Sequence, residues 1–147
     1  MDIDAMLCDH AETAEGKLFI NGAAISLLWV APQPPHVINL GVAAVVHVPY
    51  TDTNQPHQIR VTLVDEDGDP VVPWSPEGSP SPDAVEITGD FNVGRPPTLS
   101  PGESQALPFA FQMTGLPMPR LGLHSVVVEI DGVERRRLSF RVLVQNS

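Results

Sequence analysis

The sequence is poor in several residue types on which many folds and sites depend. Among its 147 residues there is one cysteine, Cys8, so no disulfide can form within the chain. Small secreted domains often need disulfides, and this shortage favours a reducing, cytoplasmic compartment. Aromatic residues make up only 5% of the chain, so the core has to be built from Val, Leu, Ile and Ala.

Long apolar runs and positive charges are also scarce. No run of about 18 apolar residues is present, so no membrane span is expected. The acidic start MDIDAMLCDH lacks a basic region followed by an apolar run, so no signal peptide is expected either. Eight Lys and Arg residues stand against 18 Asp and Glu residues, which gives a formal net charge of −10. Because an acidic surface repels phosphate backbones, nucleic acid is not expected as a partner.

Motifs for catalysis or metal binding are missing as well. There is no phosphate-binding loop and no GxSxG nucleophile elbow. Cys8, Asp9 and His10 are adjacent, but zinc needs three or four suitably spaced ligands, and the chain has neither a second cysteine nor spaced histidines. We interpret Cys8 as a small buried hydrophobe, and we predict no catalytic residue, no metal and no cofactor.

The acidic stretch from Asp65 to Asp69 resembles a calcium-binding loop only superficially. An EF-hand needs glycine at position 6 and glutamate at position 12. Counting from Asp65, these positions hold Pro70 and Pro76. The stretch is therefore interpreted as a β-turn whose acidic side chains face solvent.

Proline and glycine are abundant, with 16 and 11 copies, and they divide the chain into short segments. Such punctuation favours short strands over long helices. Alternating apolar residues then predict an all-β sandwich of about seven to nine strands in a single domain, residues 1–147, with a barrel as the alternative. The segments expected to be extended are 17–30, 37–50, 59–72 with a turn at Asp67-Gly68, 84–93, 105–113 and 121–144.

Three assignments in the first third of the chain stay open. In residues 2–14 the apolar positions fit a helical stripe, and they also fit a strand if Asp9 is tolerated inside. The pair Asn21-Gly22 accepts positive φ, so it marks either a kink or a hairpin turn. Residues 37–50 are apolar on both faces, which predicts either a central strand covered on both sides or a strand whose outer face meets a partner.

Residues 121–144 give the clearest pattern, two strands joined by Asp131-Gly132, which is a strong hairpin signal. A strict two-residue turn would carry charges onto the core face, because a shift of one residue reverses every side chain. A bulged turn, with Gly132 in a left-handed conformation, avoids this conflict. The expected pairs are Val126 with Leu138, His124 with Phe140, and Glu129 with Arg135.

Two parts of the sequence resemble known families. The end of the chain, with Leu121-Gly122-x-His124, Asp131-Gly132 and Leu138-x-Phe140-Arg141-Val142, resembles the last two strands of bacterial immunoglobulin-like domains. Where those domains have a tyrosine, this sequence has His124. The histidine either imitates the tyrosine's hydrogen bond to a loop carbonyl, or the tyrosine corner is missing from this protein. Near the start, Cys8-Asp9-x-Ala11, Gly16-Lys17-Leu18 and Gly22 resemble a family of small, uncharacterised bacterial proteins, a domain of unknown function. The resemblance implies a single immunoglobulin-like antiparallel β-sandwich, a strand over residues 4–12, and no catalytic residue.

The preferred function is a non-catalytic protein-interaction or assembly module that either self-associates or docks on a larger protein. Its support is a mixed apolar and basic set expected on outward strand faces, because exposed apolar patches mark interfaces. The candidate interface residues are Ala43, Val45, Leu123, Val127, Arg135, Arg137, Arg141 and Leu143.

Two other functions were weighed against this one. A small-ligand or glycan-binding sandwich would use the Pro/Ser-rich loop 73–83, with Trp74 as its stacking platform, whereas Trp29 is expected to pack in the core. A cysteine- or metal-dependent enzyme is the third hypothesis, and no motif supports it.

Overall fold

The computed structural model describes residues 1–146, and this part of the chain is all-β, as the sequence predicted. It contains one 3-10 turn (Tyr50–Asp52) and no α-helix, so it holds no helix that could cross a membrane. The strands are β1 (Asp2–Ala14), β2 (Lys17–Ala23), β3 (Leu27–Val30), β4 (His36–Pro49), β5 (Pro56–Asp65), β6 (Glu86–Asn92), β7 (Ser104–Met118), β8 (Gly122–Ile130) and β9 (Val133–Val144).

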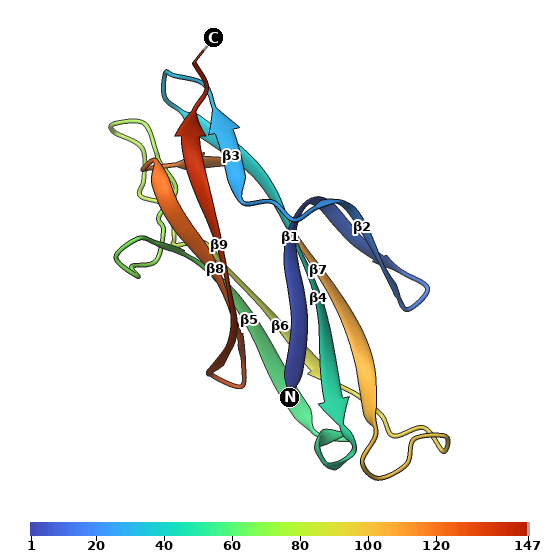
Figure 1. Ribbon diagram of the computed structural model, residues 1–147. Helices are drawn as coiled ribbons and strands as arrows, with labels where there is room; N and C mark the ends of the chain where they lie inside the picture. The colour runs from blue at the N-terminus through green and yellow to red at the C-terminus, as the bar shows by residue number, and fades with distance from the viewer. Residues whose placement is uncertain (147) are drawn as a thin grey trace.

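These strands form two sheets that pack against each other (Figure 1). Sheet A has the order β2-β1-β4-β7, and sheet B has the order β3-β9-β8-β5-β6. All neighbours are antiparallel except β3 and β9, which run parallel. Because each sheet has its own two edges, the barrel alternative is wrong.

The main hydrophobic core lies between the sheets and is built largely from aliphatic side chains. From sheet A, β4 contributes alternate buried residues from Ile38 to Val48, and from sheet B, β8 contributes alternate residues from Val126 to Ile130. Phe140 is the largest of the fully buried side chains. Burying one Val, Leu or Ile side chain stabilises a fold by roughly 1.5–3 kcal/mol. Turning a strand over would expose its apolar side chains and lose this stabilisation. The period-two pattern therefore determines which face of each long strand points inward.

The β8–β9 hairpin has the predicted pairing away from its turn. His124 pairs with Phe140, and Val126 pairs with Leu138. His124 is 1% exposed, which confirms its inward orientation.

The turn itself differs from the prediction. Ile130 pairs with Val133, so the turn has two residues, and Asp131 and Gly132 both have positive φ, 51° and 81°. Positive φ at both positions is typical of a type I′ turn.

The expected pair of Glu129 with Arg135 is also wrong, because Glu129 pairs with Glu134. The register shifts in the next step, where Val128 pairs with Arg136. The bulge therefore lies in β9 beside Arg135 rather than in the turn. Beyond this bulge the alternate apolar residues of β9 still face the core.

The first hairpin settles the open assignments near the N-terminus. β1 is a strand over its whole length, so the helical alternative is wrong and the strand over residues 4–12 is confirmed. The hairpin turns at Glu15-Gly16, where both residues have positive φ, and not at Asn21-Gly22. In Figure 1 this hairpin turns away from the long axis of the other strands.

Two further segments depart from the expected strands. After β5 the chain makes only an isolated bridge between Val64 and Pro70, so the predicted strand after Asp67-Gly68 does not form. β7 is longer than expected and forms the edge of sheet A. Its edge position agrees with Pro108, since a proline cannot donate to a neighbouring strand.

Candidate interaction surface

The outer face of sheet B carries a group of apolar side chains where β3 lies beside β9. The register places Leu27 next to Arg141 and Trp29 next to Leu143. On the other side of Arg141, β8 places Leu123. Side chains of one parity share a face of a sheet, so these five residues lie together. We call Leu27, Trp29, Leu123, Arg141 and Leu143 the β3–β9 corner.

The apolar members of this corner reach solvent. Trp29 is 57% exposed and Leu27 is 47% exposed, and Leu123 and Leu143 are half-buried. The prediction that Trp29 packs in the core is therefore wrong. The reason is that β3 is a four-residue edge strand whose other two residues, Leu28 and Val30, face the core.

Two arginines of sheet B form ion pairs on its outer face. Arg60 lies 3.1 Å from a Glu86 oxygen and 3.7 Å from a Glu129 oxygen, and Arg137 lies 2.8 Å from a Glu134 oxygen. None of the ion pairs among residues 1–146 includes Arg135, Arg136 or Arg141 of β9, and of these three only Arg141 lies among the apolar residues of the β3–β9 corner. The β3–β9 corner thus holds an exposed cation without a carboxylate partner in the described part of the chain.

The residues predicted as an interface do not form one surface. Ala43 and Val45 point outward from sheet A, whereas the other six belong to β8 and β9 of sheet B. Ala43 is 1% exposed and Val127 is 6% exposed, so neither side chain offers contact area in this conformation. Sequence reasoning found three of the five corner residues and missed Leu27 and Trp29.

Ala43 is covered by side chains of β1, β2 and β7. Gly41, one alternate position away on β4, has no side chain, and the side chain of Gln112 on β7 crosses this gap. Gln112 Nε2 donates to the Asp9 carbonyl at 3.0 Å, and its Oε1 accepts from the Ala11 amide at 3.4 Å. A second, small core forms here from Cys8, Ala11 and Ala43, with Leu18 and Ala110 packed against it.

Cys8 has no exposed surface in this small core. Burial, with the neighbouring Asp9 carboxylate as a second cause, raises the pKa of its thiol. Because the thiolate is the reactive form, a buried thiol with a raised pKa is a poor nucleophile and a poor metal ligand. The interpretation of Cys8 as a small buried hydrophobe is confirmed.

The acidic turn after β5 brings three carboxylates together. One oxygen each from Asp65, Asp67 and Asp69 lies within 4.8 Å of the others. Asp65 Oδ1 accepts from the amides of Asp67 and Asp69, and Arg120 lies 3.4 Å from Asp65 and 3.5 Å from Asp67. The carboxylates thus stabilise the turn through hydrogen bonds to its backbone and contact one arginine, as expected of a β-turn with exposed acids.

Trp74 begins the Pro/Ser-rich loop and is 39% exposed. Its backbone amide donates to the Pro117 carbonyl at 2.8 Å, which ties the start of the loop to the end of β7. The backbone that carries the exposed indole is therefore tied to a defined place on the surface.

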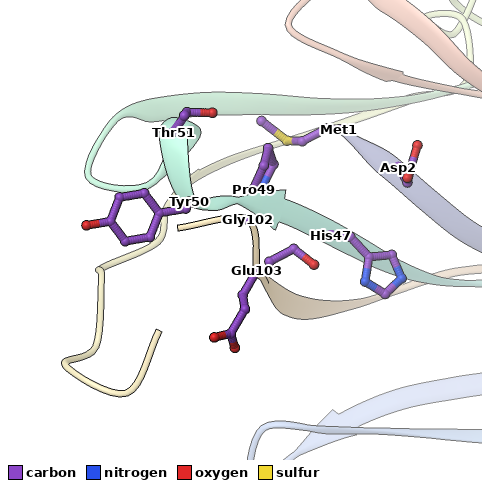
Figure 2. Close-up of a pocket in the computed structure, with 9 residues that line it drawn as sticks. Met1, Asp2, His47, Pro49, Tyr50, Thr51, Gly102 and Glu103 are labelled. Carbon is purple, nitrogen blue, oxygen red and sulfur yellow. The ribbon is translucent and has the colours of Figure 1, made fainter. Parts of the chain in front are cut away.

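An open depression of about 340 Å³ lies at the end of the sandwich near the N-terminus (Figure 2). Its lining includes His47, Tyr50 and Glu103, whose side chains point in different directions in Figure 2. His47 Nε2 contacts Asp4 at 2.8 Å, and the Arg95 guanidinium lies 3.9 Å from the centre of the Tyr50 ring. These groups are engaged with partners of their own and do not converge on a common point.

The fold and its surfaces define an all-β protein of two packed sheets with one mixed apolar and basic corner. The chain belongs to the Family of unknown function (DUF6941), whose family model matches residues 3–143. A comparison with curated proteins found no match.

Proposed function

We propose that this protein is a non-catalytic protein-interaction module that docks on another protein. The observation that carries the proposal is the position of Arg141, an exposed cation without an ion pair among residues 1–146, which is set among Leu27, Trp29, Leu123 and Leu143. Scattered exposed apolar residues are common, but a group of them that includes Trp and Arg has the composition of an interface centre.

We also infer that the sandwich is immunoglobulin-like, of the kind found in bacterial proteins. The orders β1-β4-β7 and β9-β8-β5 correspond to strands A-B-E and G-F-C of that fold. His124 lies near the start of the F-like strand β8, and its Nδ1 contacts the Gly122 carbonyl oxygen at 2.9 Å. This contact resembles, at shorter range, the bond that the corner tyrosine makes to upstream backbone.

We also propose that the protein is cytoplasmic. The lone buried Cys8 fits this proposal, because a reducing compartment keeps thiols free.

A pair of measurements tests the interaction role. We expect tagged protein to capture a stoichiometric protein partner from a lysate of its native host, and light scattering on purified protein to report whether it binds itself. A protein that is monomeric at all concentrations and captures nothing above a tag-only control would contradict the proposal. An Arg141→Glu variant, carried through both measurements, reports whether the β3–β9 corner is the surface used.

A glycan-binding role is the second candidate, and the exposed and backbone-anchored Trp74 favours it. Tryptophan faces serve as platforms for sugar rings, and the anchoring lowers the entropy that binding would cost. In a Trp29→Phe variant the tryptophan fluorescence reports Trp74 alone. A saturable change in this fluorescence with any member of a glycan panel would favour sugar binding, and an unchanged signal across the panel would count against it.

A further inference from the structure

We infer that the β3–β9 corner binds an extended, acidic and apolar segment of a different protein, with a carboxylate of that segment on Arg141. The inference rests on the proposed interaction role and specifies the partner's chemistry. It is argued from the arrangement of the corner, from its charge and from the open edge of β3.

The apolar side chains surround the cation on both sides. Leu27 of β3 and Leu123 of β8 flank Arg141 across the strands. Leu143, two residues along β9, lies beside Trp29. A segment that runs along β3 would place apolar side chains beside Leu27 and Trp29, while a carboxylate on the same face reaches toward the Arg141 guanidinium on the next strand. Removal of the surrounding apolar surface from water strengthens such a charged contact.

The charge distribution determines the sign of the partner. The protein carries a net charge of −10, yet four of its eight cations lie on β9, at Arg135, Arg136, Arg137 and Arg141. Among these four, Arg137 pairs with Glu134. A basic strand on an acidic molecule directs an acidic partner to this face and repels basic ones.

A second copy of this chain is the less favourable occupant. A two-fold contact through this surface would bring the basic β9 of both copies into one interface, where the arginines of the two copies repel each other. A second copy that used one of its acidic faces instead would form open-ended assemblies, which light scattering would detect. Nucleic acid and anionic membranes also offer negative charge, but they extend beyond the basic strand and meet the acidic rest of the protein, which repels them more than it repels a short segment.

The extended form of the partner follows from sheet topology. β3 is the edge strand of sheet B, so in the described part of the chain its outer backbone edge has no neighbouring strand. Such an edge can accept an added strand, whose alternate side chains then lie on one face of the sheet. Here that face is the one with Leu27 and Trp29.

Fluorescence anisotropy with two labelled peptides of about 12 residues tests the inference, because strand addition needs segments of this length. One peptide alternates Asp and Glu with Leu and Phe, and the other carries Lys at the acidic positions. The variants are Arg141→Glu and Trp29→Ser, both at exposed sites, and the matched control is Lys17→Glu, the same charge change at the start of β2 in sheet A.

We expect the acidic peptide to bind wild-type protein with a Kd below about 1 mM and at least about tenfold more tightly than the basic peptide. Arg141→Glu should weaken acidic-peptide binding at least about tenfold and reverse the preference, and Trp29→Ser should weaken it by a similar factor. Lys17→Glu should bind like the wild type.

Several results would overturn the inference. They are the absence of saturable binding by the acidic peptide, equal binding of both peptides, or equal losses in Arg141→Glu and Lys17→Glu. Binding of phosphatidylglycerol vesicles that Arg141→Glu abolishes, without peptide binding, would assign the corner to lipid instead. If the peptides fail while lysate capture still yields a partner that Arg141→Glu retains, the interaction role stands and this surface is not the one used.

Discussion

His57 and Asp131, which are 74 residues apart in the sequence, join the start of β5 to the β8–β9 turn through a 2.7 Å contact between Nδ1 and Oδ2. The other ring nitrogen, Nε2, lies 2.8 Å from the Asp52 carbonyl oxygen. Because both neighbours are acceptors, the imidazole satisfies both only when it carries two protons. Burial of the ring opposes this charge, but the bonds to Asp52 and Asp131 outweigh burial and raise the pKa of His57.

The first prediction concerns the pH dependence of this contact. A raised folded-state pKa stabilises the fold below the unfolded-state value, near 6.5 for histidine, and the stabilisation is lost as pH rises through the folded-state pKa. Partial burial of the Asp131 carboxyl opposes its ionisation, but the bonds from His57 and Gln58 lower its pKa, so its contribution is lost only in strong acid. We expect the free energy of unfolding in urea to fall by roughly 1 kcal/mol from this pair as pH rises from about 6.5, the unfolded-state value, into the alkaline range. The value is low because Asp131 is 48% exposed.

Asp131→Asn is the matched variant for this prediction. Asparagine tolerates the left-handed conformation of a type I′ turn, so the turn is kept while the charge is removed. The fall in stability over this pH range should become smaller in Asp131→Asn than in the wild type. An unchanged slope would show that the pair does not cause it.

The second prediction concerns His124, whose pH effect has the opposite sign. Burial lowers the pKa of His124, and its Nε2 has no hydrogen-bond partner among residues 1–146. As pH drops below about 6.5, His124 becomes protonated in the unfolded chain more readily than in the folded protein. The free energy of unfolding therefore falls. His124→Phe removes the unpaired nitrogen and keeps a ring against Phe140, which stacks on His124 at 5.7 Å.

We expect His124→Phe to change the free energy of unfolding at neutral pH by less than about 1.5 kcal/mol, as for other shape-conserving core changes. Stability at about pH 5 should then decrease less than in the wild type. His10→Phe makes the same replacement at an exposed position of β1, and comparison with it separates the effect of burial from that of losing a histidine. A His124→Phe protein with the wild-type acid slope would refute this role of His124.

The third prediction concerns the absent side chain at Gly41. A Cβ atom there would lie 2.8 Å from Gln112 Oε1, 2.9 Å from Cys8 Sγ and 3.3 Å from the Ala11 nitrogen. Gly41→Ala should therefore destabilise the protein by about 1–3 kcal/mol and speed amide exchange at Ala11. Gly89→Ala on β6 is the control, because its Cβ would meet only Ile59 at 3.5 Å, an ordinary contact distance. Equal losses in the two variants would contradict the crowding argument.

The fourth prediction concerns the reactivity of Cys8. Because the thiol is buried and its pKa is raised, an aromatic disulfide reagent should label native protein at least about 100-fold more slowly than urea-unfolded protein. A Cys8→Ala/Ser81→Cys variant carries its thiol on the exposed loop 73–83 and should react at the unfolded rate in the native state. If native Cys8 reacts as fast as Cys introduced on this loop, the burial argument fails.

Long alternating segments made much of the fold predictable, because a period of two reports directly which face of a strand is inward. Residues 121–144 predicted the pairs of His124 and Val126 for this reason. The turn was predicted wrongly because a bulge at Asp131-Gly132 and a bulge at Arg135 lead to the same pairing farther along the strands. The pattern constrains only that later pairing.

The β3–β9 corner was only partly predictable for a different reason. Residues 27–30 are apolar at every position, so their alternation does not indicate which pair faces solvent. The orientation of Trp29 depends on its pairing with Leu143, at the opposite end of the sequence. Such a contact is a property of the strand order, which local patterns do not contain.

The parallel pairing of β3 with β9 has a consequence for synthesis of the protein in the cell. Residues 27–30 are made early, but their neighbours, residues 141–144, emerge from the ribosome after every other strand described here. Until then β3 has no strand to pair with, and the edge of β8 that β9 later pairs with stays open. Non-local pairing of this kind slows folding. The nascent chain therefore spends most of its translation with strand edges open, which is the period in which a chaperone would be of most use to it.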